Sequence, residues 1–137
     1  MKNVRYLAIA VLILMIAAAT PGFAQVSSTK VSVPFEFQVG NSILPAGEYS
    51  LTQFAGQALV IENASGKGSA VAITNTTGGN GEARQPHLTF NRYGEKYFLA
   101  EAWLRYSNAG RVLHVSPAEM EIARVTPTSE LVTVGMK

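Results

Sequence analysis

The stretch VSVPFEFQVGNSILPAGEYSL, residues 31–51, decides the fold class of this chain. Apolar side chains occupy every second position from Val31 to Val39, and polar side chains or proline occupy the positions between them. A period of two is typical of a β-strand with one buried face, because successive side chains of a strand point to opposite sides. The pattern therefore predicts a half-buried strand.

Two prolines punctuate this stretch. Pro34 has no backbone N–H to give to a neighbouring strand, so its strand is expected at an edge of a sheet or at a bulge. Pro45 lies in LPAG, residues 44–47, which suits a tight turn with proline at the second position and glycine at the fourth. Because conformational preference explains each of these residues, we interpret the motif as scaffold rather than as a site.

Further runs with a strand-like pattern follow along the chain. They cover residues 58–63, 69–74, 88–93 and 96–106, and shorter runs cover residues 111–115 and 131–134. Gly94 and Glu95 separate the two aromatic-rich runs, and glycine at the first central position is what a two-residue type II′ hairpin requires. Since the run at 96–106 is apolar on both faces, we expect it to be central in the sheet.

The period changes at SPAEMEIAR, residues 116–124. Ser116 suits the N-cap of a helix, Pro117 suits the first helical position, and Glu119 completes a capping box. The whole pattern predicts an all-β, mainly antiparallel fold. Its form is a small meander barrel or sandwich of about six to eight strands with one short C-terminal helix.

Two registers of the aromatic hairpin remain open. A two-residue turn sets Phe90 opposite Leu99 and Arg92 opposite Tyr97. That register gives one face composed of Leu88, Phe90, Tyr97, Leu99 and Trp103. A three-residue turn instead joins Leu88 and Phe90 to Phe98, Ala100, Ala102 and Leu104.

Residues 1–24 have the features of a signal peptide. Lys2 and Arg5 precede an apolar run at Leu7–Ala19, and Gly22, Phe23 and Ala24 form a small-x-small cleavage site. The apolar run is too short for a hydrocarbon core of about 30 Å. We therefore expect cleavage after Ala24, no stable membrane span afterwards, and one secreted β domain at residues 25–137 in the periplasm or outside the cell.

Composition removes several classes of chemistry. Cysteine and aspartate are absent, which excludes disulfides, thiol catalysis, aspartate-based calcium loops and triads with aspartate. His87 and His114 have no partner nearby in sequence, so no metal site is expected, and no phosphate loop or nucleophile elbow occurs. Without Lys2 and Arg5 the basic and acidic residues are equal in number, which argues against nucleic acid as a partner. We predict a protein without catalytic residues or cofactors.

Two segments resemble a known family. Residues 31–51 and LTFNRYGEKYFLAEAW at 88–103 are similar to the paired signatures VPFxFxVGxxxLPAGxYxL and FxRYGxxYFLxxxW of small secreted hypothetical proteins of soil bacteria. The resemblance implies export and a shared β fold. The function of that family is unassigned, and it supplies no catalytic residue.

Two classes of function remain. The first is an exported noncatalytic interaction or structural module, whose partner is an envelope protein or a polysaccharide; the second is a small β-barrel that binds an apolar ligand. For the first class, the candidate binding residues are Arg92, Tyr97, Glu101 and Trp103, which share one face in the two-residue register. The alternative is that Trp103 belongs to the core and Glu101 is solvated or paired.

Overall fold

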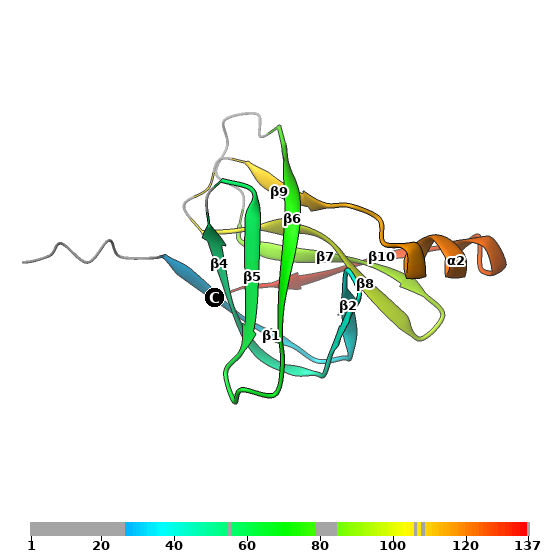
Figure 1. Ribbon diagram of the computed structural model, residues 1–137, viewed down its shortest axis with the longest axis horizontal. Coiled ribbons are helices and arrows are strands. Elements are labelled where there is room, and N and C mark those ends of the chain that lie inside the picture. The colour runs from blue at the N-terminus through cyan, green and yellow to red at the C-terminus, as the bar shows by residue number, and fades with distance from the viewer. Residues whose placement is uncertain (1–26, 55, 79–84, 106, 108, 137) are drawn as a thin grey trace, which may run out of the picture.

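The computed structural model describes residues 27–54, 56–78, 85–105, 107 and 109–136, so the expected signal peptide at 1–24 lies outside the described residues. Within them the chain forms ten strands and one helix (Figure 1). The first six strands are β1 (Ser28–Val33), β2 (Phe37–Val39), β3 (Ser42–Leu44), β4 (Gly47–Phe54), β5 (Ala58–Asn63) and β6 (Ser69–Thr77). The remaining elements are β7 (His87–Tyr93), β8 (Lys96–Trp103), β9 (Gly110–Leu113), α2 (Pro117–Val125) and β10 (Glu130–Gly135).

All ten strands belong to one branched sheet. The main path runs β1-β4-β5-β6-β9-β8-β2-β3, and β7 joins β8 to β10. Every pairing is antiparallel except that between β2 and β8. The predicted all-β, mainly antiparallel class with one short C-terminal helix is therefore confirmed. The described residues form ten strands rather than the expected six to eight, and the strands do not close into the barrel that was one expected form. The sheet is open, because β1 and β10 approach each other in the described part of the chain without pairing.

The opening motif forms more strands than its pattern indicates. The alternation at 31–39 breaks after Val33, so β1 and β2 are separate strands with different neighbours. β1 pairs only with β4 and is an edge strand, as Pro34 predicts. LPAG links β3 to β4, and the buried Tyr49 hydroxyl donates to the carbonyl of Pro45 across this turn. These contacts support the interpretation of the motif as scaffold.

Aromatic rings from three distant strands fill the core. Phe37 of β2 contacts Tyr49 of β4 and Phe90 of β7 edge to face, with ring centroids 5.2 and 5.4 Å apart. All three side chains are almost completely buried. Burying a side chain of this size is worth roughly 1.5–3 kcal/mol, so this cluster fixes the positions of β2, β4 and β7.

The β7–β8 hairpin combines the two predicted registers. Arg92 lies opposite Tyr97 and Phe90 opposite Leu99, as a two-residue turn requires, and Gly94 has φ of +62°. A bulge next to Phe90 then shifts the pairing by one residue. The residues after Tyr97 that join the main hydrophobic core are consequently Leu99, Ala102 and Leu104. The prediction that Trp103 shares a face with Leu88 and Phe90 is therefore wrong. The alternative prediction is wrong for Phe98 and Ala100, but it is right for Ala102 and Leu104.

β8 is central, as its two apolar faces predict. It pairs with β7 along one edge, while β9 and β2 share its other edge. Because it joins three strands, β8 holds together the two branches of the sheet.

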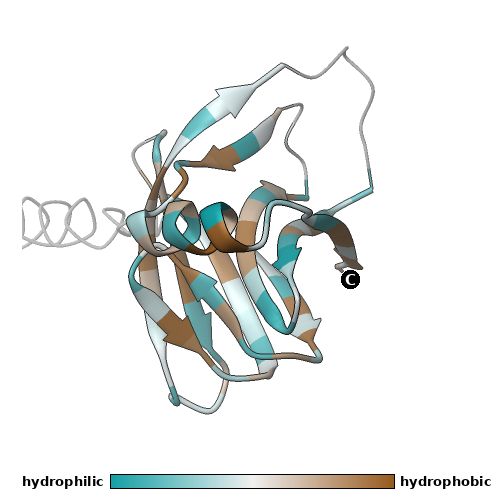
Figure 2. Ribbon diagram, turned by 90° about the vertical axis from the view of Figure 1, so that its right-hand side faces the viewer, coloured by the Kyte–Doolittle hydropathy of each residue, from teal (hydrophilic) through white to brown (hydrophobic). Residues whose placement is uncertain are grey.

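Helix α2 begins as predicted but uses Glu119 differently. The Ser116 hydroxyl accepts a hydrogen bond from the backbone N–H of Glu119 at 3.2 Å, and Pro117 is the first helical residue. The Glu119 carboxylate does not complete a capping box, because it accepts hydrogen bonds from Asn91 and Tyr93 of β7. Figure 1 shows α2 extending beyond the strands, and Figure 2 shows it in front of them with apolar and polar residues on its surface. No helix in the described ranges is both long and apolar enough to span a membrane.

Candidate functional site

The bulge in the β7–β8 hairpin divides the four predicted binding residues into two pairs. Arg92 and Tyr97 stay together, with the Arg92 guanidinium carbon 5.5 Å from the Tyr97 ring centroid. Phe35 stacks on Tyr97 at 3.8 Å between centroids. Arg92 also donates to the Gly94 carbonyl at 2.7 Å and lies 3.7 Å from the carboxylate of Glu130. This half-exposed pair is held mainly by contacts within the domain.

Glu101 and Trp103 form the second pair, on the opposite face of β8. The indole N–H of Trp103 donates to the Glu101 carboxylate, and the ring stacks on His87 at 6.1 Å. Trp103 is only 4% exposed. The structure therefore does not bring the four residues onto one face, and it agrees with the alternative that Trp103 is buried and Glu101 is paired. Partner binding by Arg92 and Tyr97 stays a prediction.

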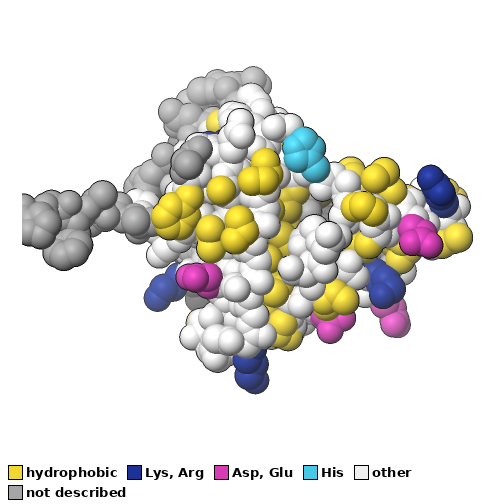
Figure 3. Space-filling view, viewed as in Figure 1, with side chains coloured by type: hydrophobic (Ala, Val, Ile, Leu, Met, Phe, Trp, Pro, Cys, Tyr) yellow, Lys and Arg dark blue, Asp and Glu magenta, His cyan; other side chains and the backbone are white. Residues whose placement is uncertain are grey.

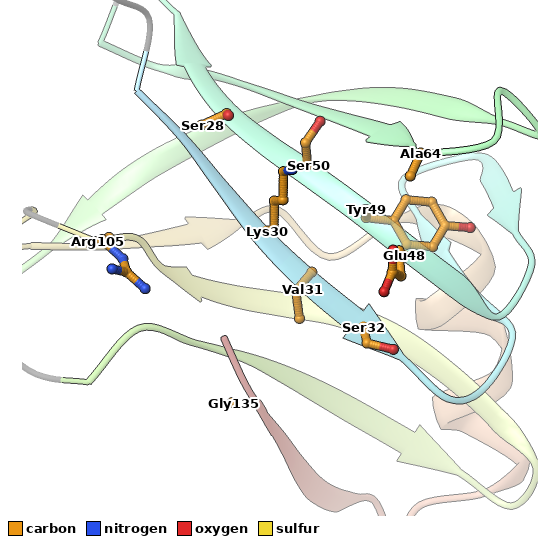
Figure 4. A pocket seen from close by; sticks show the side chains of 10 residues that line it. All are labelled: Ser28, Lys30, Val31, Ser32, Glu48, Tyr49, Ser50, Ala64, Arg105 and Gly135. Carbon is orange, nitrogen blue, oxygen red and sulfur yellow. The ribbon is translucent and has the colours of Figure 1, made fainter. Parts of the chain in front are cut away.

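A cleft of about 550 Å³ lies beside the unpaired edge of β1. Figure 4 shows Lys30 and Ser32 along β1, Glu48 on β4, Arg105 just after β8 and Gly135 on β10. The lining combines opposite charges with serine hydroxyls and contains no histidine to activate a hydroxyl. It therefore offers charged groups and hydroxyls for polar contacts.

An apolar surface covers part of the outward side of β4, β5, β6 and β9. Val71 and Ile73 of β6 are 67% and 58% exposed, and Phe54 of β4 is 49% exposed. Val60 lies opposite Val71, and Ala58 lies opposite both Ile73 and Phe54. Figure 3 shows hydrophobic side chains gathered over β4, β5 and β6. With Val112 of β9, the residues Phe54, Ala58, Val60, Val71, Ile73 and Val112 form what we call the apolar sheet face.

Polar residues border the apolar sheet face along the strands. At one end Lys30, Ser50, Glu62 and Ser69 lie side by side on successive strands. At the other end Asn75 pairs with Val112, and its amide nitrogen lies 3.4 Å from Nε2 of the exposed His114. An apolar centre with a polar rim is the usual anatomy of a protein interface.

One feature of the sequence could have indicated the apolar sheet face, but it was also compatible with a fully buried strand. Residues 70–73, AVAI, are apolar at four consecutive positions. Such a run is typical of a strand buried on both faces. In the structure Ala70 and Ala72 are buried while Val71 and Ile73 are exposed. The same four-residue run was therefore also compatible with a strand that buries one face in the core and presents the other to a partner.

Searches for other kinds of site and for related proteins were negative. In the described ranges no three His, Cys, Asp or Glu side chains are grouped to hold a metal ion. No protein-family model, curated protein or solved structure matches this chain. The observed class is an all-β domain with an exposed apolar sheet face, and its function must be inferred from that surface.

Proposed function

We propose that this protein is an exported, noncatalytic interaction module of the cell envelope or extracellular space, and that it docks to a protein partner through the apolar sheet face. The observation that carries the proposal is the exposure of Val71, Ile73 and Phe54 side by side on the sheet. A solvated face of an antiparallel sheet normally alternates to polar residues. Here it does not.

The energetics of exposure favour a binding role. Monomeric proteins rarely expose contiguous apolar patches beyond a few hundred Å², and larger patches mark interaction sites. Covering the exposed parts of Val71 and Ile73 recovers roughly 1–2 kcal/mol for each side chain. The aliphatic character of the face favours a protein partner over a polysaccharide, since sugars are usually bound by stacking on aromatic rings.

The alternative function, a small β-barrel for an apolar ligand, has less support. Such a ligand would occupy the space between the strands, where Phe37, Tyr49 and Phe90 already contact one another. The open seam between β1 and β10 also leaves the described sheet unclosed.

Photocrosslinking tests the proposed docking surface. Val71 is replaced by benzoylphenylalanine in the full chain, expressed in cells that export it, and Leu131 is replaced in the same way as a control. Leu131 is as exposed as Val71 but lies on β10, which belongs to the other branch of the sheet. We expect a discrete covalent adduct from position 71 and none from position 131. Equal adducts from both positions, or none from either, would contradict the proposal.

Export needs its own measurement. The expected cleavage site predicts that the mature protein begins at Gln25. Intact-mass analysis of the protein from periplasm and medium should show the loss of residues 1–24. A mass that retains Met1 would contradict export by this route.

A further inference from the structure

We infer that the partner on the apolar sheet face is a second copy of this chain, packed sheet against sheet. The inference rests on the proposed docking role of that face. It adds the identity of the partner and the arrangement of the two copies.

The shape and composition of the face favour another sheet as its occupant. Val60, Val71, Ile73 and Val112 are β-branched, Ala58 is small, and Phe54 is the aromatic member. Side chains of this kind interdigitate between two sheets that pack about 10 Å apart in β-sandwiches. The six residues line neither the β1 cleft nor the smaller hollow beside the β5–β6 turn. They are spread over four neighbouring strands and offer a broad surface to a partner.

The size of the face is adequate for a stable dimer. Together with its rim it extends over β1, β4, β5, β6 and β9 and over several successive outward positions of these strands. At strand spacings of about 4.8 Å and outward residues about 6.8 Å apart, the roughly 14 outward positions of the face and its rim give a projected area of roughly 450 Å². A standard interface buries about 800 Å² of accessible surface on each partner, and corrugated side chains make the accessible surface larger than its projection.

The rim charges favour an antiparallel arrangement of two copies. Lys30 and Glu62 lie at one end of the face, whereas Asn75 and His114 lie at the other end. A two-fold axis in the plane of the interface and across the strands turns the Glu62 end of each copy toward the Asn75 and His114 end of the other. This arrangement keeps the two Glu62 carboxylates apart and gives each a hydrogen-bonding neighbour. Because the face carries one cation and one acid, it has no excess charge that would repel its own copy.

The oligomeric state of the exported protein tests this inference directly. Sedimentation velocity over a range of protein concentrations should show a reversible dimer. Val71→Glu places a charge in the middle of the interface and should weaken the dimer at least about tenfold. Val125→Glu, on the exposed side of α2, is the matched control and should leave the dimer unchanged. Far-UV circular dichroism of both variants verifies that they fold.

A second measurement locates the contact without relying on weakened binding. The natural chain has no cysteine, so single-cysteine variants report one position each. In the proposed dimer the sheets are about 10 Å apart, which is too far for a direct disulfide, so a bis-maleimide linker that spans roughly 10–15 Å is the probe. It should link two copies of Val71→Cys into a covalent dimer and leave Leu131→Cys monomeric. A dimer that persists in Val71→Glu, or that forms equally with Leu131→Cys, would overturn the assignment of this face to self-pairing.

The outcomes for the inference and for the proposed function can be separated. A position-71 photoadduct with twice the mass of the mature chain supports both. A position-71 adduct with a different protein, together with a strictly monomeric sedimentation profile, overturns self-pairing and leaves the docking role in place. A monomer without any position-71 adduct overturns both.

Discussion

Asn91 of β7 donates a hydrogen bond from its side-chain amide to the Glu119 carboxylate of α2 across 2.8 Å. The Tyr93 hydroxyl donates to the same carboxylate oxygen at 3.2 Å. Glu119 is the buried side chain of α2, while most of the helix surface is exposed. Attachment of this helix to the sheet therefore depends largely on one acceptor shared by two donors.

Removing that acceptor should loosen the helix. In Glu119→Ala the amide of Asn91 and the hydroxyl of Tyr93 lose their partner, and loss of hydrogen bonds to a charged group from these partly buried donors costs about 1 kcal/mol or more. Urea denaturation should show this loss in the free energy of unfolding. Glu121→Ala, on the exposed side of α2, should stay within about 0.5 kcal/mol of the natural protein. Equal effects of the two substitutions would contradict a specific role for Glu119.

Tyr93 should titrate above the ordinary tyrosine value. Burial, the negative charge of Glu119 and the hydrogen bond to that carboxylate raise the pKa of Tyr93 from 10.0, while a hydrogen bond with Ser129 partly opposes them. Because the folded-state pKa is higher than the unfolded one, the stabilisation is complete below about pH 10 and is lost as pH rises through the folded-state pKa. The tyrosinate absorbance of the natural protein minus that of Tyr93→Phe isolates this titration. A midpoint at or below 10.0 would contradict the expectation.

Gly110 should not tolerate a side chain. A Cβ atom there would lie 2.6 Å from a ring carbon of Trp103 and 2.7 Å from the methyl group of Thr77. Gly110→Ala should therefore destabilise the domain by about 1–3 kcal/mol in thermal unfolding. Gly78→Ala is the control, since no atom lies within 4 Å of its added carbon. A stable Gly110→Ala with unchanged Trp103 fluorescence would show that the packing is looser than observed.

Gly47 tests whether LPAG is scaffold or site. A Cβ atom at Gly47 would lie 3.1 Å from the amide nitrogen of Asn63, whose oxygen accepts hydrogen bonds from Ser65. Gly47→Val should displace Asn63 and lower stability by about 1 kcal/mol or more. If thermal stability is unchanged while crosslinking to the partner is lost, LPAG acts as a site instead.

Trp103 should be poorly accessible to a soluble quencher. It is the single tryptophan of the chain, so its fluorescence reports one environment, and its side chain lies against His87 and Glu101. Acrylamide should quench the folded protein far less than the protein in denaturing urea. Equally efficient quenching in both states would restore Trp103 as a candidate surface residue.

The local alternation of side chains predicted most of the strands, but it joined β1 and β2 into one strand, missed β3 and did not determine which faces are buried. Gly94 fixed the turn of the β7–β8 hairpin, and the pairs next to the turn follow from it. The bulge beside Phe90 lies where the other edge of β8 changes partner, from β2 at Phe98 to β9 at Glu101. One inserted residue exchanges the faces of every later position. Glu101 and Trp103 therefore lie on the face of β8 opposite to Tyr97 and Arg92. No local sequence pattern indicates this shift in register.

The candidate surface was missed for a related reason. An apolar outward residue and an apolar inward residue look identical in sequence, and only the partners of β6 distinguish Val71 from Ala72. The side-chain partners of Glu119 in helix α2 could not be predicted from local sequence either. Its position after Ser116 predicts a cap, whereas the neighbouring strand offers two donors that the sequence places far away.

The parallel pairing of β2 with β8 also constrains the order in which this chain can fold. Gln38 pairs with Phe98, so the early strand β2 cannot take its place before the strand near residue 98 is available. Sheets built from such distant pairs fold in milliseconds to seconds, far more slowly than sheets of neighbouring hairpins. The strands β4, β5 and β6, by contrast, pair with their neighbours in sequence, so this part of the sheet can form before β2 takes its place.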